Sequence, residues 1–424
     1  MIDIKLVREA PERYADAARV KKIAADIPAL LRADEALTAA RRDLQEARTA
    51  QNEAGKRIAK LSGEEKAAAI AEMQSLKARV KEANERIGEL EPQFNELMLL
   101  AAQPPSADVP VGEDDTDNVE LRREGEIPDF DFEPKDHVQL GEALDIIDIP
   151  RGVKLAGSRN FILKGAGAML HQAVLRLAVD QMVAKGYTLL TVPVLVNESV
   201  MYGTGYFPVG RDQAYLAERD GMSLVGTAEV PLTAYHSDET LDEADLPKKY
   251  IALSTCFRRE AGAAGKDTYG LYRIHFFDKV EQVILCRNDE QVSLEHHAEI
   301  LANAEDVLKA LSLPYRVMNV CTGDLGQGQV QKFDIECWMP SRNSFGETHS
   351  ASRFYEFQAR RLNMRYRDGD GKLRYVHTLN NTVIASPRIL IPLLELNQNA
   401  DGTVTVPEAL RPYMNGMERI ERGA

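Results

Sequence analysis

Side chains that could hold a nucleotide against an amino acid lie close together between Thr255 and Glu281. Arg258 can grip a phosphate through two parallel, charge-assisted hydrogen bonds. Phe277 offers an aromatic face for a base, and Glu281 offers a carboxylate for an ammonium group. Taken alone, Arg258 with the nearby Glu260 is more simply a surface ion pair, so the chemistry depends on what surrounds it.

The chain around these residues predicts two strands joined by a glycine-rich loop. Ile251–Phe257 is short and apolar, and Leu271–Val283 alternates between apolar and polar residues. Alternate residues of a strand point to one face, so Arg258 and Glu260 are expected on the same face. The aromatic ring and the carboxylate of the return strand, four residues apart, are expected to share a face too.

A second set of candidate residues is the short segment Gly226–Glu229, with the sequence GTAE. The Thr227 hydroxyl can hydrogen-bond an amino-acid substrate, and the Glu229 carboxylate can attract its ammonium group. Standing alone, the segment would be only an N-cap before a helix over Val230–His236.

Two further segments carry residues suited to a triphosphate. Glu347–Ser350 follows the alternating strand Asp334–Met339, and its carboxylate and hydroxyl oxygens are ligands that Mg²⁺ accepts. Without its neighbours it would be read as a polar turn. Thr378–Glu395 predicts a strand followed by an apolar helix, with Arg388 at the helix start after Pro387.

The composition limits the kind of protein. A chain of 424 residues can form two domains, and a net charge of −14 argues against general nucleic-acid binding. The four cysteines show no metal-binding or disulfide spacing, which predicts reduced thiols and a cytoplasmic protein without a protein-ligated metal. No apolar run is long enough to cross a membrane, and the N-terminus lacks an apolar signal core.

The N-terminal part predicts a small helical cap over 1–23 and then an antiparallel coiled-coil hairpin. Apolar residues recur at seven-residue spacing in two series, separated by a turn at Ser62-Gly63-Glu64. The first series contains Leu30, Leu37, Leu44 and Ile58 with companions Ala33, Ala40, Ala47, Ala54 and Leu61. The second contains Met73, Val80, Ile87 and Phe94 with companions Leu76, Ala83, Leu90 and Leu97.

A bare hairpin of this kind is most simply a dimerisation element, since it has no concave site. Its outer face also carries many basic residues, although acidic residues nearly balance them: Arg41, Arg42, Arg48, Lys56, Arg57, Lys60, Lys77, Arg79, Lys81 and Arg86. Pro104-Pro105 ends the hairpin and an acidic linker, Asp108–Asp117, follows. We therefore predict two domains, 1–105 and 106–424.

The second domain begins with an amphipathic helix over Gly167–Lys185 and a strand over Leu189–Val196 that contains Pro193. Proline inside a strand implies an edge or a bulge, which fits a subunit interface.

Together these segments resemble the class II aminoacyl-tRNA synthetases, in their seryl-tRNA synthetase form, along essentially the whole chain. F-R-x-E-A-G followed by H-x-F-x-K-V-E resembles motif 2, the helix and strand around Gly186–Val196 resemble motif 1, and Thr378–Glu395 resembles motif 3. The resemblance implies an α+β fold: the coiled-coil hairpin, then a catalytic domain on an antiparallel sheet flanked by helices.

The resemblance also implies an AMP-forming ligase that activates L-serine with ATP and Mg²⁺ and transfers it to tRNA(Ser), gripped by the hairpin. It leaves open whether selenocysteine tRNA is charged, and it implies a homodimer through Gly186–Val196. The implied ATP-binding and catalytic residues are Arg258, Arg259, Glu260, Ile274, Phe277, Glu347, Thr348, His349, Ser350 and Arg388, with Glu347 and Ser350 holding Mg²⁺. The implied serine-binding residues are Thr227, Ala228, Glu229, Glu281, Asn380 and Thr382.

The chain departs from the family pattern at several positions. These are Arg259, Phe276, Thr382 and Pro387. Three alternatives remain: a paralogue that charges a carrier protein, an inactive regulator or tRNA-binding module, and a structural coiled coil. The intact hairpin argues against the first, the retained motif residues argue against the second, and the long C-terminal part argues against the third.

Overall fold

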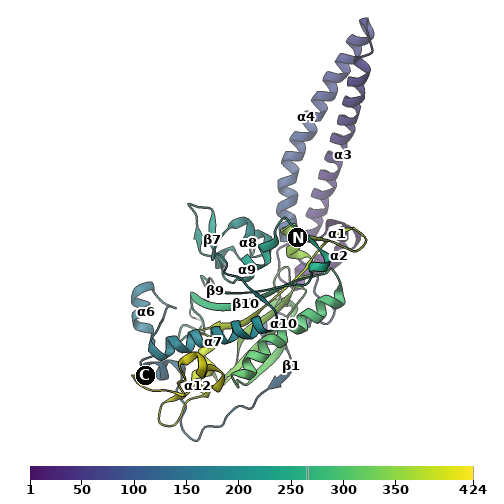
Figure 1. Cartoon of the computed structure of the whole chain (residues 1–424). Helices are drawn as coiled ribbons and strands as arrows, with labels where there is room; N and C mark the ends of the chain where they lie inside the picture. The colour runs from purple at the N-terminus through teal and green to yellow at the C-terminus, as the bar shows by residue number, and fades with distance from the viewer. Residues whose placement is uncertain (264, 266, 424) are drawn as a thin grey trace. The chain divides into compact units, whose positions relative to one another are not determined.

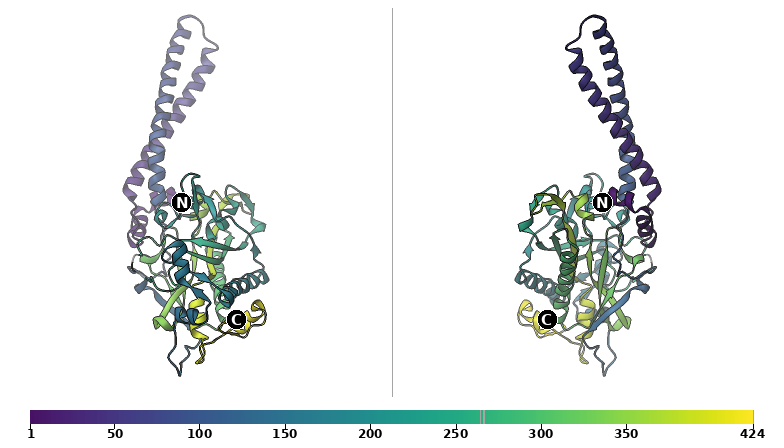
Figure 2. Two further views of the ribbon diagram at one scale, coloured as in Figure 1. Left: turned by 90° about the vertical axis from the view of Figure 1, so that its left-hand side faces the viewer. Right: turned by 90° about the vertical axis from the view of Figure 1, so that its right-hand side faces the viewer.

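The computed structural model describes residues 1–263, 265 and 267–423, and the chain divides into two compact units, 1–104 and 105–424. The first unit is entirely helical (Figure 1), with helices α1 (Ile4–Glu9), α2 (Pro11–Val20), α3 (Ile27–Ile58) and α4 (Gly63–Leu100). The predicted cap and hairpin are therefore both present. Figure 2 shows α3 and α4 running side by side as an antiparallel pair.

Local chemistry explains where the hairpin helices begin. The Asp26 side chain accepts a hydrogen bond from the Ala29 amide at 2.7 Å and so caps α3. At the turn, Gly63 adopts a φ of +62°, a left-handed conformation that glycine takes without a steric penalty. The predicted heptad positions are buried or half-buried along the seam, and Arg41 pairs with Glu91 across it at 2.5 Å. Since Arg57 also pairs across the hairpin, with Glu72, part of the basic outer face is neutralised internally.

The second unit is built on a sheet with the strand order β1-β11-β12-β13-β16-β10-β9-β4. All neighbours are antiparallel except β4 and β9, which confirms the predicted α+β class. The strands are β1 (Val119–Glu124), β11 (Tyr315–Asn319), β12 (Gln331–Met339), β13 (Ser344–Arg353), β16 (His377–Ser386), β10 (Phe276–Cys286), β9 (Lys248–Phe257) and β4 (Thr188–Leu189).

Shorter strands form small sheets around the large one. They are β2 (Ile147–Asp148) with β3 (Ile162–Leu163); β5 (Leu195–Asn197), β7 (Met222–Leu224) and β6 (Leu216–Ala217); β8 (Thr240–Asp242), β14 (Arg365–Arg367) and β15 (Leu373–Tyr375); and β17 (Val404–Thr405) with β18 (Arg419–Ile420). The helices of this unit are α5 (His137–Ala143), α6 (Ile149–Ala156), α7 (Gly165–Ala184), α8 (Glu198–Thr204), α9 (Glu229–Thr233), α10 (Glu290–Ala310), α11 (Phe357–Arg361) and α12 (Leu390–Leu396).

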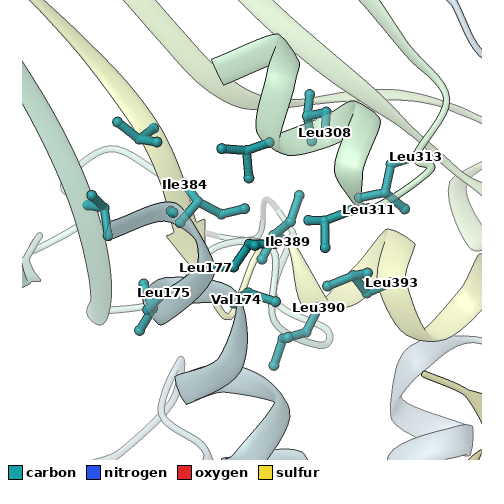
Figure 3. Close-up of a cluster of buried hydrophobic side chains, with 14 of the residues drawn as sticks. Val174, Leu175, Leu177, Leu308, Leu311, Leu313, Ile384, Ile389, Leu390 and Leu393 are labelled. Atoms are coloured by element: carbon teal, nitrogen blue, oxygen red, sulfur yellow. The ribbon is translucent and has the colours of Figure 1, made fainter. Parts of the chain in front are cut away.

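The main hydrophobic core lies between the large sheet and the helices α7, α10 and α12. Figure 3 shows side chains from all three helical segments meeting Ile384 of β16, among them Val174, Leu308 and Leu390. A second cluster covers the other face, where Val283 and Leu285 of β10 pack with residues of α9 and α11. The central strands are therefore buried on both faces, which holds their polar residues in fixed positions.

Two predicted strand boundaries are wrong. Instead of one strand over Leu189–Val196, the chain forms β4 and β5, which belong to different sheets, with Pro193 between them. Proline lacks the backbone N–H that a continued ladder needs. The predicted strand Leu271–Val283 begins only at Phe276, because the preceding residues leave the sheet to line the site described below.

All four cysteines are buried free thiols, as predicted. Within the described part of the chain, no helix is both long and apolar enough to cross a membrane.

Candidate active site

A cavity with about 820 Å³ of empty space, partly open to solvent, lies above the central strands of the second unit. Most of the predicted site residues line it, although they come from four separate segments of sequence: Glu229, Arg258, Glu260, Ile274, Phe277, Glu281, Glu347, Thr348, His349, Ser350, Asn380, Thr382 and Arg388.

Three predicted residues do not line this cavity. Thr227 is buried beneath it, and its hydroxyl accepts a hydrogen bond from Lys279 Nζ at 2.6 Å. Ala228 is fully buried in the second core cluster. Arg259 turns away, donating its backbone amide to the Gln213 carbonyl and its guanidinium to the Asp212 carbonyl at 3.4 Å.

Sequence reasoning missed several lining residues: Tyr206, Tyr272, Lys279, Gln329, Ser352 and Ala385. Lys279 could have been found, because it lies between Phe277 and Glu281 with the same strand alternation. Tyr206 and Gln329 belong to loops without a recognisable pattern, and only the fold brings them to the cavity.

Two arginines of the cavity lining lie over aromatic rings. The Arg258 guanidinium carbon lies 5.1 Å from the centre of the Phe277 ring. Arg388 lies 4.4 Å from the centre of the Tyr272 ring and donates hydrogen bonds to the carbonyls of Tyr272 and Glu347. The lining therefore combines positive charge with flat aromatic surfaces, the pairing that a nucleotide requires.

Glu260 reaches the cavity by a route that strand alternation does not describe. Strand β9 ends at Phe257, and Glu260 has a left-handed φ of +53°. Its carboxylate accepts a hydrogen bond from Arg273 at 2.9 Å, which fixes the residue in this conformation. The prediction that Arg258 and Glu260 share one face of a strand is wrong, although both line the cavity.

Glu347 and Ser350 lie within β13, so the alternative of a polar turn is wrong. Residues three apart on a regular strand face opposite sides. Here the register with β12 slips at Thr348, since Ile335 pairs with His349 and Glu336 pairs with Glu347. This β-bulge adds one residue, and both oxygen-bearing side chains line the cavity.

Charges around β13 favour an ionised Glu347. Desolvation raises the pKa of its carboxyl, but the positive charges of Arg388, Lys332 and Arg258 outweigh this and hold the pKa below its ordinary value. Burial lowers the pKa of His349 to about 4, so its imidazole is neutral near pH 7. The lining here therefore offers oxygen ligands and one carboxylate charge.

The cavity lining also includes two buried acids, Glu229 and Glu281. Glu229 accepts hydrogen bonds from the Tyr206 hydroxyl and from Gln358 Nε2, both at 2.8 Å. Burial, with the nearby charge of Glu281, raises the pKa of Glu229 to about 7. An ammonium group arriving here would relieve this unfavourable ionisation.

Glu281 lies on the same side of β10 as Phe277 and Lys279, and it forms a buried ion pair with Lys279. Its register partner on the neighbouring strand is Thr382. A carboxylate and a hydroxyl therefore stand side by side, a pair that can recognise a small hydroxyl group by hydrogen bonds.

Comparison with known proteins gives matches along the whole chain. Residues 1–100 match the model of the seryl-tRNA synthetase N-terminal domain, and residues 215–397 match that of the tRNA synthetase class II core domain (G, H, P, S and T). The chain is 45% identical to the serine–tRNA ligase of Deinococcus radiodurans, over 99% of this chain and 98% of that protein.

Solved structures agree with the sequence matches. The seryl-tRNA synthetase of Pyrococcus horikoshii, complexed with ATP, has a TM-score of 0.93 at 36% identity, covering 100% of both chains. The cytoplasmic serine–tRNA ligase of Naegleria fowleri, in complex with AMP, has a TM-score of 0.88 at 28% identity, covering 100% of this chain and 99% of that one.

Proposed function

The chain belongs to the seryl-tRNA synthetase family, and on this premise we propose how its own residues activate serine and charge tRNA. The activity is ATP-dependent formation of seryl-adenylate followed by transfer of the seryl group to tRNA. The observation that supports the residue roles is the convergence of four separate segments on one cavity.

In the first step, an oxygen of the serine carboxylate attacks the α-phosphorus of ATP, and pyrophosphate leaves. Arg258 holds the α-phosphate and stabilises the charge that develops on its oxygens. The Phe277 ring stacks on the adenine, and Arg388 covers the opposite side. Glu260 and the backbone of Ile274 bind the adenine edge. Catalysis is by positioning and charge stabilisation, without a covalent enzyme intermediate.

Magnesium fits the donor set of β13. Mg²⁺ prefers oxygen ligands, keeps several waters and is completed by substrate phosphates. The Glu347 carboxylate and the Ser350 hydroxyl would hold it, and the described residues contain no cluster of three His, Cys, Asp or Glu side chains able to bind a metal unaided. The ion would neutralise triphosphate charge and orient the leaving group.

The serine pocket is proposed around the two buried acids of the cavity lining. Glu229 takes the ammonium group, while Glu281 and Thr382 take the side-chain hydroxyl, and Asn380 lies beside them. Thr227, beneath the cavity floor, acts through its hydrogen bond with Lys279.

Thr382→Ser is expected to leave serine kcat/KM within about twofold and to raise threonine activation by about tenfold. Removing one methyl from a tight pocket changes discrimination by roughly 10- to 200-fold. Thr382 is buried opposite Glu281, where its methyl group would crowd the extra methyl of threonine. Amino-acid-dependent pyrophosphate exchange measures both rates. An unchanged threonine rate would mean that the Thr382 methyl points away from the substrate.

For the second step, we propose that the hairpin of α3 and α4 grips tRNA(Ser). Arg42, Lys56, Lys60, Lys77, Arg79 and Arg86 carry exposed positive charges on this unit. The chain as a whole has a net charge of −14, which disfavours RNA binding, so an RNA contact has to use a local set of basic residues such as this one.

Shortening the hairpin tests this role. Arg41 lies opposite Glu91, so replacing 44–88 with the native turn 60–65 keeps that pair and removes the distal arm. Serine-dependent pyrophosphate exchange is expected to stay within about twofold, whereas tRNA(Ser) charging falls at least about tenfold. Equal charging by the shortened and full-length chains would assign the hairpin to oligomerisation or structure instead.

A homodimer through Gly186–Val196 is also proposed. β4 is an edge strand of the large sheet, and apolar side chains are exposed on or beside it: Val183, Leu189, Leu195 and Leu253. Exposed apolar groups on an edge strand favour pairing with a second copy.

A cytoplasmic location is proposed as well. The reduced, buried cysteines fit this location.

The overall assignment is tested by pyrophosphate exchange with each of the twenty standard amino acids, followed by tRNA charging. Serine alone is expected to give rapid exchange, and tRNA(Ser) is expected to accept it. Exchange with another amino acid, or charging of a carrier protein instead of tRNA, would contradict the assignment. The same charging assay with selenocysteine tRNA decides whether that RNA is a second substrate.

A further inference from the structure

Three amide side chains lie buried behind the proposed serine pocket, on the opposite face of the sheet. Gln282 of β10 and Asn381 of β16 are 0% exposed, and Asn303 of α10 is 4% exposed. On this face of the sheet, Gln282 lies between the buried apolar residues Val280 and Ile284 of β10. Burying an amide is unfavourable unless it is hydrogen-bonded, so these side chains require an explanation.

The three amides form one directed chain of hydrogen bonds. Lys185 Nζ donates to Asn303 Oδ1 at 2.7 Å, and Asn303 Nδ2 donates to Gln282 Oε1 at 2.9 Å. Gln282 Nε2 then donates to Asn381 Oδ1 at 2.7 Å and to the Ile300 carbonyl at 2.9 Å. The lysine can only donate, so it fixes the orientation of every amide that follows.

The chain ends where two strands carry the serine-recognising residues. Gln282 pairs with Asn381 in the β10–β16 register, and the adjacent pair is Glu281 with Thr382. Because side chains alternate along a strand, Glu281 and Thr382 line the cavity while Gln282 and Asn381 face α10.

The register between these strands is not regular at this point. Val280 pairs with Ile384 and Glu281 with Thr382, so Val383 is an extra residue in β16. The flanking side chains are apolar, so they could still pack if the extra residue of β16 lay one position earlier or later in the strand. If it moved to the far side of Thr382, that threonine would no longer stand opposite Glu281.

We propose that Gln282 and Asn381 are positioning residues for serine recognition: their buried hydrogen bond fixes the bulge at Val383 and so holds Glu281 opposite Thr382. This inference rests on the proposed roles of Glu281 and Thr382 in the serine pocket. Asn303 and Lys185 orient the Gln282 amide from outside the sheet.

Gln282→Met tests the proposal, because methionine keeps the length of the side chain and removes its hydrogen bonds. The matched control is Gln331→Met. Gln331 is a buried amide of β12, 2% exposed, and it donates to Asp108 Oδ2 at 2.7 Å instead of to a strand of the serine pocket.

Both variants are expected to lower the melting temperature. Only Gln282→Met is expected to raise the KM for serine by about tenfold and to narrow the serine/alanine kcat/KM ratio by about tenfold, since a misplacement near 1 Å can cost up to a hundredfold. The KM for ATP is expected to stay within twofold in both. A purely structural role would lower stability without this selective change in the two serine parameters.

The inference is overturned if Gln282→Met keeps both the serine KM and the serine/alanine ratio within twofold of the unmodified chain. Should Gln282→Met not fold, Asn303→Leu removes the donor to Gln282 without altering either strand. It is expected to raise the serine KM about threefold, and an unchanged KM overturns the inference equally.

If Glu281→Ala and Thr382→Ser also leave discrimination between serine and other amino acids unchanged, the proposed pocket itself fails. If those two change it and the amide variants do not, only this inference fails.

Discussion

Arg258→Ala is expected to lower serine-dependent pyrophosphate exchange by about a hundredfold or more while leaving the fold intact. A group that stabilises charge developing in the transition state has an effect of this size when it is removed. Arg258 is exposed, and its side chain makes a 3.3 Å hydrogen bond to the Gly226 carbonyl and a contact with the Phe277 ring. Its loss should therefore cost little stability.

Arg259→Ala is the comparison for this experiment. The Arg259 guanidinium is directed to the Asp212 carbonyl outside the cavity, so its removal is expected to have a much smaller effect on exchange. Near-normal exchange in Arg258→Ala together with a large loss in Arg259→Ala would show that the two adjacent arginines have been assigned the wrong way round. Thermal unfolding of both variants separates loss of activity from loss of structure.

Glu281→Ala is expected to abolish serine activation at a measurable rate and to narrow the ratio of kcat/KM for serine to kcat/KM for alanine. A site that hydrogen-bonds a substrate hydroxyl can reject the analogue lacking it by about 10⁴–10⁵, because buried polar groups are otherwise left unpaired. Glu281 is 1% exposed and lies opposite Thr382. Values of kcat/KM for serine and alanine, measured by pyrophosphate exchange, give the ratio directly.

Glu281→Ala also removes the partner of Lys279, which is 5% exposed. A buried charge left without its partner destabilises a fold by roughly 3–5 kcal/mol. The control is therefore the double variant Glu281→Ala with Lys279→Met, which should recover stability but not discrimination. If the double variant regained the original serine/alanine ratio, Glu281 would be a structural partner of Lys279 and not the residue that reads the hydroxyl.

Strong periodicity and local turn chemistry made much of the fold predictable. The hairpin followed from two heptad series and a glycine turn, since burial along one stripe of each helix leaves little freedom. The strand Asp334–Met339 and the strand-then-helix segment around Arg388 were predictable for the same reason. The prediction of one strand over Leu189–Val196 was wrong. Distant residues decide which sheet a short extended segment joins, and the local sequence does not show them.

The candidate site could be predicted wherever functional groups lie within one motif. The bulge at Thr348 has no sequence signature, although it alone brings Glu347 and Ser350 to the same cavity. Tyr206 and Gln358, which hold the Glu229 carboxylate, are distant from it in sequence and meet it only through packing of α9 against its neighbours. The direction of the Arg259 side chain, toward the Asp212 carbonyl, could not be predicted, since a motif position gives no direction for a side chain beyond a strand end.

The type of residue buried between α3 and α4 changes along the length of the hairpin. Toward the end where α3 begins, the buried residues include Ile27, Leu30 and Leu37, but beyond Leu37 every buried residue of α3 is alanine. At about 25 cal/mol for each Å² of apolar surface removed from water, an alanine contributes much less than a leucine. The free energy of local opening therefore declines toward the turn at Gly63, and backbone amides there exchange hydrogen with solvent soonest. The turn end of the hairpin can therefore change its conformation to fit a partner, while the end where α3 begins stays folded.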